Sequence, residues 1–364
     1  MRSVADYQPK TLDLEITSKC NISCRYCYLG KPGTGSMDMV TAAQVVAYAE
    51  KLATHHCHPI IVNLHGGEPF LNFDTVQFLV SYAPARFTIF TNGATATTEQ
   101  VRWCQRHKVA AKRSTAACRE AADLTRPDGY TDQWLTEGAL WDDYGATHRL
   151  TVIPATAPYI VRSVQWLRQE GYYGPVDIAT DDYSLWTPDE QDIFASQLNW
   201  LADLYILHFR RGDVLGVENF ANFGRAIFGQ SAVMVLGCGA GWETVGITTS
   251  GRIVYCHRAF RTPMEPTLTV ADLLDGKPLD FGPAFTARFT DISTGREEPD
   301  CQRCEARQCC PHGCLHVSHV TGGNFTHQPE HRCRFVRLYR DIALRINDAL
   351  STTDPRWWEK PSKL

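Results

Sequence analysis

The sequence lacks the long apolar run that a membrane-spanning protein would need. No stretch approaches the roughly 18 apolar residues of a membrane helix, and residues 1–10 contain no apolar signal region. Charge of one sign is also scarce, because 36 basic residues stand against 40 acidic ones, for a formal net charge of −4. These absences give no electrostatic case for nucleic-acid binding and predict a cytoplasmic protein without a membrane anchor.

Cysteine, in contrast, is plentiful, with 14 among 364 residues. In a chain of this size without a signal peptide, such a count favours metal binding over disulfides. Three of the cysteines lie early, and most of the others crowd between residues 238 and 333. The length is sufficient for a sizeable core and for two domains.

Strand-like and helix-like segments alternate from residue 11 to about residue 209. Predicted strands cover residues 11–17, 60–65, 87–91, 109–113, 149–153 and 175–180. Predicted helices lie near residues 41–53, 73–82, 97–107, 133–144, 158–170 and 188–205, with Thr41 expected to cap the first. Repeated strand–helix units imply parallel strands with right-handed crossovers. Six units suit a partial (β/α)6 TIM barrel of the α/β class.

The pattern changes after about residue 210, where glycine and cysteine become more frequent. Residues 245–256 predict two short strands around a Ser-Gly turn, and residues 334–350 predict a helix. The tail with Trp357 and Trp358 is expected to be an irregular segment lying on the body of the protein. We therefore expect three parts: a barrel over 1–215, a small cysteine-rich domain over 216–335, and a C-terminal helix and tail over 336–364.

Cys20, Cys24 and Cys27 follow the first predicted strand, on the loop that leaves its carboxyl end. Barrel enzymes place their active sites at this end of the strands. Three thiolates can hold three irons of a [4Fe–4S] cluster and leave the fourth iron open for a ligand. The alternative, a zinc site, commonly needs four ligands in paired knuckles, which this spacing does not supply.

This C-x3-C-x2-C motif, with Tyr26 before its third cysteine, resembles the signature of the radical S-adenosylmethionine (SAM) enzymes. The resemblance implies that the open iron binds the amino and carboxylate groups of SAM. An electron from the cluster would then cleave SAM to methionine and a 5′-deoxyadenosyl radical, which removes a hydrogen atom from the substrate. The cofactor carries this chemistry, and the protein supplies binding and orientation.

Two further elements resemble SAM-contacting motifs of the same family. The sequence Gly66-Gly67-Glu68-Pro69 follows the second predicted strand, and the resemblance implies contact with the methionine amine of SAM. Thr91-Asn92-Gly93 ends the third strand; alone it would be read as a turn, but the resemblance implies a position close to SAM.

The stretch after the fourth predicted strand departs from the family pattern, because the expected Asp-Gly pair is missing. Ser114 matches the serine of that pattern, and Arg126, twelve residues later, matches an arginine that pairs with the SAM carboxylate. The alternative interpretation of Arg126 is a solvated surface arginine.

The late cysteines resemble the SPASM domain, an auxiliary-cluster module of many peptide-modifying radical SAM enzymes. The resemblance implies two auxiliary [4Fe–4S] clusters, three clusters in all. Its second auxiliary cluster would be held by Cys301, Cys304, Cys310 and Cys333. Its first would be held by Cys238, Cys256 and Cys314, with a fourth iron that is open, bound by another side chain, or bound by substrate.

Two alternatives remain for these late cysteines. Cys309 could replace Cys310 as a ligand, although the spacing favours Cys310, and residues 301–314 could form a zinc knuckle.

The residue after the second SPASM cysteine is His257. In a sulfatase-maturing subfamily this position carries a carboxylate that accepts a proton, so the histidine argues against that activity. His257 could itself accept a proton near neutral pH, or it could be structural. A peptide-cross-linking subfamily carries an N-terminal peptide-binding domain. Ten residues precede the first strand, so we expect that domain to be absent and its task to fall to the barrel cleft or to a separate recognition protein.

The leading hypothesis is a radical SAM/SPASM enzyme that abstracts hydrogen from a peptide or protein residue, leading to oxidation or cross-linking. An external donor such as a flavodoxin or ferredoxin would supply the electron. The first rival is a dehydrogenase or rearrangement enzyme for a small molecule. The second is a zinc or iron–sulfur scaffold without catalysis.

Overall fold

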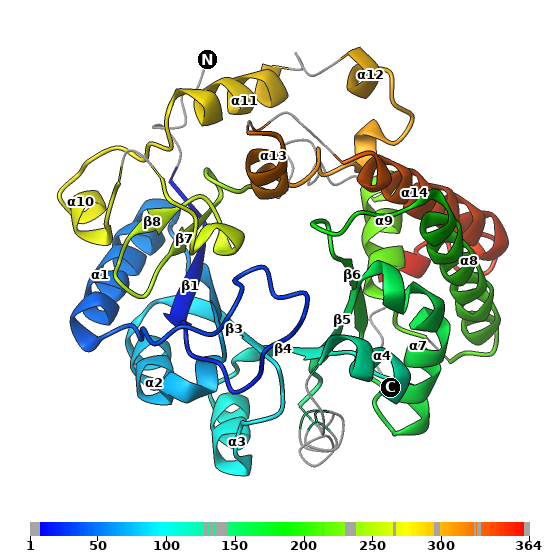
Figure 1. Ribbon diagram of the computed structural model, residues 1–364, viewed down its shortest axis with the longest axis horizontal. Helices are drawn as coiled ribbons and strands as arrows, with labels where there is room; N and C mark the ends of the chain where they lie inside the picture. Colours follow the sequence, from blue (N-terminus) through cyan, green and yellow to red (C-terminus); the bar gives the residue numbers. More distant parts are fainter. Residues whose placement is uncertain are drawn as a thin grey trace. The chain divides into compact units, whose positions relative to one another are not determined.

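The structure is a computed structural model of the chain. It describes residues 8–126, 130, 134, 141, 144–213, 215–229, 238–264, 267–294, 299–323, 325 and 329–359. Its contacts define two compact units, and each is presented by itself below (Figure 1). The first unit holds Met1–Lys112, Cys238–Arg296 and Gly323–Thr326. The second holds Arg113–Gly237, Glu297–Gly322 and His327–Leu364. The domain boundaries expected at residues 215 and 335 stay predictions.

Strand β1 (Thr11–Thr17) lies in the middle of the sheet of the first unit. It pairs in parallel with β2 (Ile60–Gly66) on one side and with β7 (Thr244–Ile247) on the other. Strand β3 (Ala85–Thr91) pairs in parallel with the other side of β2. Strand β8 (Ile253–Val254) pairs with β7 in antiparallel orientation. A segment more than 200 residues along the chain therefore extends the sheet beside β1.

The helices of the first unit between its parallel strands match the prediction. They are α1 (Met39–His56), α2 (Phe73–Tyr82) and α3 (Thr98–Arg106). Thr41 was expected to cap α1, and this is wrong. The helix begins two residues earlier, and Asp38 is the N-cap, whose Oδ1 accepts from the Thr41 N–H at 2.8 Å. The other helical segments among the residues described in this unit are η2 (Pro69–Asn72), η4 (His257–Ala259), α10 (Val270–Leu274) and α11 (Pro283–Thr294).

The second unit contains the parallel pair β5 (Thr147–Val152) and β6 (Val176–Thr180). Strand β4 (Ala110–Thr115) begins in the first unit and ends in the second. The helix predicted near 133–144 lies outside the described residues, apart from residues 134, 141 and 144. In the described part of this unit the helical segments are α4 (Arg119–Thr125), η3 (Pro154–Tyr159), α7 (Ile160–Gln169), α8 (Pro188–Arg210), α9 (Glu218–Phe228), α12 (Pro299–Gln302), η5 (Arg307–Cys309), α13 (Leu315–Gly322), α14 (Glu330–Leu350) and η6 (Trp357–Glu359).

Helix α14 packs against α8 and α9 (Figure 1). Aromatic side chains of the three helices meet there. Phe194 of α8 and Phe335 of α14 lie 4.3 Å apart between ring centroids. Trp357 is fully buried, and a Cβ atom on Gly224 of α9 would lie only 2.7 Å from its ring. The tail is thus a short 3-10 turn whose tryptophans complete this core.

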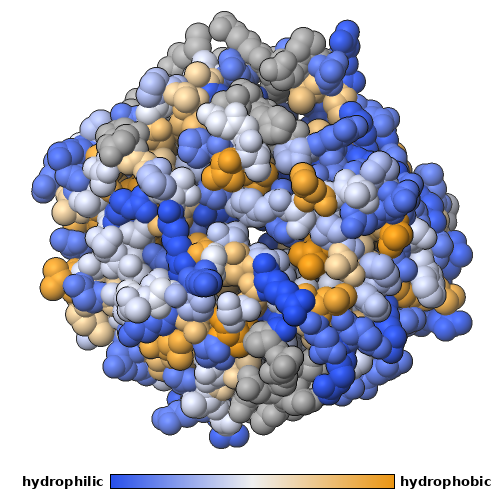
Figure 2. Space-filling model, in the orientation of Figure 1, coloured by the Kyte–Doolittle hydropathy of each residue, from blue (hydrophilic) through white to orange (hydrophobic). Residues whose placement is uncertain are grey.

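The parallel strands separated by helices confirm the predicted α/β class and partial (β/α)6 barrel. Among the described residues, no helix has both the length and the apolar character that crossing a membrane requires. On the face shown in Figure 2, the apolar residues of the described part form small separate patches between hydrophilic ones.

His148 on β5 is a fully buried histidine in the second unit. Its ring lies 5.5 Å from that of Tyr172 and 5.9 Å from that of Trp134. Neither ring nitrogen has a hydrogen-bond partner among the described residues. Burial, followed by the charges of Arg113 and Arg168, lowers the pKa of His148 to about 3.

We predict that His148 makes the protein acid-sensitive. The pKa of His148 is about 6.5 in the unfolded chain and about 3 in the folded chain. Between these pH values, the unfolded chain is protonated at this residue and the folded chain is not. The free energy of unfolding should therefore fall by about 1.4 kcal/mol per pH unit in that window because of this residue. Urea unfolding at pH 7 and pH 5 should show a smaller loss for His148→Gln than for wild type. Equal losses would contradict the prediction.

Candidate active site

The loop that carries Cys20, Cys24 and Cys27 leaves the end of β1 and returns to it. The N–H of Cys27 donates to the carbonyl of Cys24 at 3.1 Å, which forms a tight turn between two of the cysteines. The N–H of Gly33 donates to the carbonyl of Ser18 at 2.8 Å and closes the loop. All three cysteines are half-buried, so their thiols lie on one closed loop with partial access to solvent.

The backbone of Gly66-Gly67-Glu68 binds the first residues of this loop directly. The N–H of Gly67 donates to the carbonyl of Thr17 at 2.7 Å, and the N–H of Glu68 donates to that of Lys19 at 2.8 Å. A Cβ atom on Gly66 would lie 2.2 Å from the Thr17 oxygen, and one on Gly67 would lie 2.1 Å from the Lys19 oxygen. The two glycines are therefore needed for close approach to the cysteine loop itself.

The Glu68 carboxylate is fully buried and joins the ends of two strands. Its Oε1 accepts from the hydroxyl of Thr91 at 2.9 Å and from the N–H of Phe70 at 3.3 Å. Its Oε2 accepts from the N–H of Asn92 at 2.8 Å. Glu68 thus connects the end of β2 to the end of β3, and Pro69, also buried, begins η2 directly after it. Contact of Glu68 with the SAM amine stays a prediction.

Asn92 extends from the end of β3 to the cysteine loop. Its Nδ2 donates to Asn21 Oδ1 at 2.8 Å and lies 3.7 Å from Cys20 Sγ, within hydrogen-bond distance for sulfur. Its Oδ1 accepts from the N–H of Ala94 at 2.9 Å. The Thr-Asn-Gly element is therefore more than a turn, because it contacts the first cysteine directly.

Arg261 supports the other half of the loop, and the sequence analysis did not select it. Its guanidinium donates to the carbonyls of Leu29 and Lys31 and, at 3.4 Å, to that of Ser18. The residue lies 241 positions after Cys20, just beyond η4, so no local sequence pattern indicates the contact.

These residues fit an iron–sulfur cluster. Burial raises the pKa of the Cys20 thiol to about 11 in the metal-free chain, so this cysteine loses a proton when it binds iron. Three half-buried thiols on a loop that other elements hold match the three-ligand requirement of a cluster with one open iron. Tyr26 is half-buried, with its hydroxyl shielded from solvent.

His257 is held by a buried aspartate of β1. Its backbone N–H and its Nδ1 both contact Asp13 Oδ2, at 3.2 and 2.9 Å. The other carboxylate oxygen accepts from Asn63 Nδ2 at 2.9 Å and lies 3.6 Å from His65 Nε2. Burial raises the pKa of Asp13, but the charges and hydrogen bonds of His257 and His65 outweigh it and hold that pKa well below its usual range.

Asp13, His65 and His257 have ligand atoms within 4.8 Å of one another, yet the ring geometry argues against a shared metal ion. The imidazoles of His65 and His257 stack at 4.5 Å with planes only 10° apart. A metal lies in the plane of each imidazole that binds it, and two stacked parallel rings offer no common point. The cluster instead orients His257 with Nδ1 toward the carboxylate and Nε2 turned away from it.

Ser114 and Arg126 belong to the second unit. The carbonyl of Ser114 accepts from the Tyr130 hydroxyl at 2.9 Å and from Trp134 Nε1 at 3.1 Å. Arg126 is only 4% exposed, and its guanidinium carbon lies 4.6 Å from the centroid of Tyr130. The alternative of a solvated surface arginine is therefore wrong, and the SAM-binding roles of both residues stay predictions.

Cys304, Cys310 and Cys333 gather in the second unit. Burial is the largest cause that raises the pKa of Cys310, and the neighbouring Cys333 and Cys304 sulfurs raise it further. Cys304 likewise contributes to the raised pKa of Cys333. Cys301 is one turn from Cys304, whose N–H donates to its carbonyl at 3.2 Å. This grouping fits the four ligands expected for the second auxiliary cluster.

Cys309 is more deeply buried than its neighbour Cys310. It is buried with Ala306 and Val336 in an apolar cluster, and its Sγ donates to the Ala306 carbonyl at 3.3 Å. Cys310 is half-buried. Cys304 and Cys310 also pack against this cluster, so the choice of Cys310 over Cys309 as the ligand stays a prediction.

The residues expected to hold the first auxiliary cluster are divided between the units. Cys238 and Cys256 belong to the first unit, and Cys314 belongs to the second. Cys238 is exposed, whereas Cys256 is buried just before η4. This ligand set stays a prediction.

Comparison with known proteins agrees with this site. Residues 14–111, which include the cysteine loop and both strand-end motifs, match the Radical SAM superfamily. An uncharacterized protein of Methanocaldococcus jannaschii is 36% identical over 73 residues, a match that spans 20% of this chain and only 24% of that protein.

Two solved structures share the fold at low sequence identity. One, anSMEcpe with bound AdoMet, has a TM-score of 0.73 and 15% identity and covers 94% of this chain and 98% of its own. The other, SuiB of Streptococcus suis bound to S-adenosylmethionine, has a TM-score of 0.60 and 17% identity and covers 90% of this chain and 77% of its own.

Residues 14–111 thus match a radical SAM domain, and the two solved structures share the fold of the chain. The resemblance of the late cysteines to the SPASM module stays a prediction. A radical SAM domain implies SAM and a [4Fe–4S] cluster, which Cys20, Cys24 and Cys27 would hold.

We predict that Gly67→Ala prevents formation of the cluster held by Cys20, Cys24 and Cys27. The added methyl group would meet the Lys19 carbonyl at 2.1 Å and Cys20 Cβ at 3.0 Å, so the loop must move. Iron per chain after anaerobic reconstitution should fall by about four relative to wild type. Gly30→Ala is the control in the same loop, because nothing lies within 4 Å of its new Cβ. Its φ of +71° adds backbone strain without a clash, so retained iron in this variant assigns the loss in Gly67→Ala to the clash. Wild-type iron in Gly67→Ala would contradict the prediction.

We also predict opposite outcomes for two adjacent cysteines. Cys310→Ala should lose about four irons per chain, because a ligand of the second auxiliary cluster is removed. Cys309→Ala should keep them and lose only some stability, because its side chain packs in an apolar cluster. Iron and sulfide analysis of both variants checks this, and the reverse result would exchange the two assignments.

Proposed function

We propose that this chain abstracts a hydrogen atom from a residue of a peptide or protein, leading to its oxidation or cross-linking in the manner of peptide-maturing enzymes. The observation that carries the proposal is the attachment of the three-cysteine loop to Gly67, Glu68 and Asn92 in the unit that also holds His257. The ring of His257, bound to buried Asp13, lies 5.8 Å from that of Tyr28 on the cysteine loop. The bound cluster and SAM supply the hydrogen-abstracting radical.

A peptide substrate is supported by two similar structures. SuiB has been solved bound to its precursor peptide SuiA, and anSMEcpe with a Kp18Cys peptide. Because these proteins share the fold of this chain, a peptide is the substrate class to test first. The rival is a small molecule, which would give SAM cleavage without peptide modification.

The chain's own residues would hold the cofactors and handle one proton. The strand-end motifs would bind and orient SAM, a role that the family resemblance also gives to Ser114 and Arg126. Asp13 holds the Nδ1–H of His257 and leaves Nε2 as the nitrogen that can accept a proton. His257 is thus the proposed base.

Oxidation of the peptide requires an acceptor for each hydrogen and each electron that the substrate loses. The substrate loses two hydrogens: one leaves as a hydrogen atom, and the other leaves as a proton to His257 Nε2. One electron remains, and an auxiliary cluster would accept it. We assign two auxiliary [4Fe–4S] clusters to this role, the first with only three cysteine ligands.

The proposed partners follow from this chemistry. A flavodoxin or ferredoxin would reduce the SAM-binding cluster, and a separate recognition protein could deliver the peptide. Clusters with an open iron are oxygen-sensitive, so we place the enzyme in a reducing cytoplasm.

The test uses reconstituted enzyme with SAM, a reductant, and short peptides encoded beside its gene. Wild type should form 5′-deoxyadenosine and a peptide that has lost two hydrogens. His257→Ala and Asp13→Asn should still cleave SAM but should lower peptide product by at least about tenfold, because general-base catalysis contributes factors of this order or larger.

Two controls separate the possible failures. The triple variant Cys20/Cys24/Cys27→Ala should cleave no SAM. SAM cleavage by wild type without change to any peptide would refute the peptide proposal and favour a small molecule. Zinc instead of iron, with no SAM cleavage, would refute the enzyme reading altogether. Unchanged product in His257→Ala would exclude that residue as the base.

A further inference from the structure

Cys333, a proposed ligand of the second auxiliary cluster, lies in the first turn of α14 between two arginines. This helix end is unusual in its chemistry. Pro329 at the N-cap offers no side-chain cap, and positive charges near a helix N-terminus oppose the helix dipole. Arg332 and Arg334 therefore require partners from elsewhere in the second unit.

Arg332 is paired with a buried carboxylate that follows strand β6. Its guanidinium lies 2.5 Å from Asp182 Oδ2, and the side chain of Asp182 is only 2% exposed. The hydroxyl of Thr180, the last residue of β6, donates to the other oxygen of Asp182 at 3.2 Å. Because the carboxylate is buried and Arg332 is only half-buried, water screens this pair less than an exposed one, and the pair restrains both partners.

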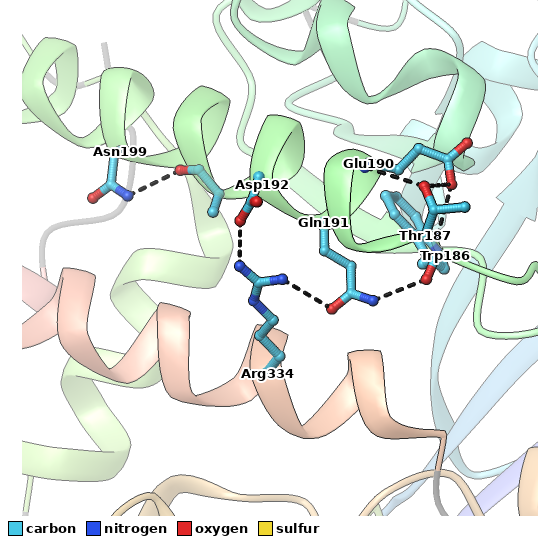
Figure 3. A network of polar contacts seen from close by, with 8 residues as sticks. Trp186, Thr187, Glu190, Gln191, Asp192, Asn199 and Arg334 are labelled. Atoms are coloured by element: carbon cyan, nitrogen blue, oxygen red, sulfur yellow. Dashed lines mark hydrogen bonds and ion pairs between the residues drawn. The ribbon is translucent and has the colours of Figure 1, made fainter.

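Arg334 makes a second, exposed contact to α8 (Figure 3). It pairs with Asp192 and donates at 3.3 Å to Gln191 Oε1. Gln191 Nε2 in turn donates to the carbonyl of Trp186 at 2.9 Å, so the contact reaches the segment that follows β6. The side chains of Asp192 and Arg334 are 67% and 44% exposed, and water therefore weakens this pair.

The spacing of these residues gives the two pairs a joint effect. Successive helical residues are turned by about 100° around the axis, so Arg332 and Arg334 point to either side of Cys333. Holding both fixes the rotation of α14 about its own axis, and with it the direction of the thiol. The buried pair dominates, because the exposed one is solvated.

We propose that Asp182 is a positioning residue that directs Cys333 into the second auxiliary cluster through its ion pair with Arg332. This rests on the proposed cluster. The end of β6 is where barrel enzymes bind their substrates. The pair would therefore join the substrate end of the barrel to an electron-accepting cluster within one unit.

The test compares reconstituted full-length variants by iron and sulfide content and by the EPR spectrum of the reduced protein. Cys333→Ala sets the reference, with about four irons lost. Asp182→Asn should lose most of the same iron and the same EPR signal. Asp182→Glu, which restores the charge, should recover both. Asp192→Asn, the matched control on the exposed pair, should remain close to wild type.

The outcomes separate the two proposals. Wild-type iron in Cys333→Ala would refute the cluster itself. Loss in Cys333→Ala with wild-type iron and signal in Asp182→Asn would overturn the role of Asp182. The EPR signal of the cluster held by Cys20, Cys24 and Cys27 should change when SAM is added. That change reports whether the fold is intact. If Asp182→Asn loses the SAM-dependent EPR change, Arg332→Lys is measured instead. Less iron in the second auxiliary cluster, with the SAM-dependent change intact, would support the proposal. Wild-type iron in that cluster would overturn it.

Discussion

Hydrogen bonds between two backbone segments hold the radical SAM site together. The N–H groups of Gly67 and Glu68 bind the carbonyls of Thr17 and Lys19, immediately before the first cysteine. The interaction requires backbones too close for side chains, which explains both glycines. The Glu68 carboxylate binds the N–H of Asn92 at the end of β3, and the Asn92 side chain in turn contacts Cys20 Sγ. The cysteine loop is thus preorganised before any cofactor binds.

Buried carboxylates recur as the means by which this chain orients functional side chains. Glu68, Asp13 and Asp182 are each almost inaccessible to water, and each accepts from donors on other elements. An ionised group in such a place is stable only when its donors are in position. Each carboxylate therefore selects one arrangement of its neighbours: the strand ends, the His257 imidazole, or the first turn of α14.

Much of the fold could be predicted because it depends on local patterns. The alternating run at 11–17 and the helical stripe of residues 41–53 specify their elements wherever they lie. The cap of α1 was assigned to Thr41 instead of Asp38, since the apolar periodicity does not reveal where the first turn begins. The short strands at 244–247 and 253–254 were expected, but their place beside β1 was not. Pairing between strands so far apart in sequence leaves no periodic signal.

The sequence by itself indicated the radical SAM domain that residues 14–111 match, because three cysteines at a fixed spacing form a recognisable motif without reference to the rest of the chain. It also indicated the strand-end motifs, which follow recognisable strands. Only the tertiary structure showed that Cys309 is buried while Cys310 is half-buried. It alone brought Asp13 to His257, Arg261 to the cysteine loop and Asp182 to Arg332. Burial, charge pairing and hydrogen bonds act over a few ångströms of space, and spacing along the chain does not encode that distance.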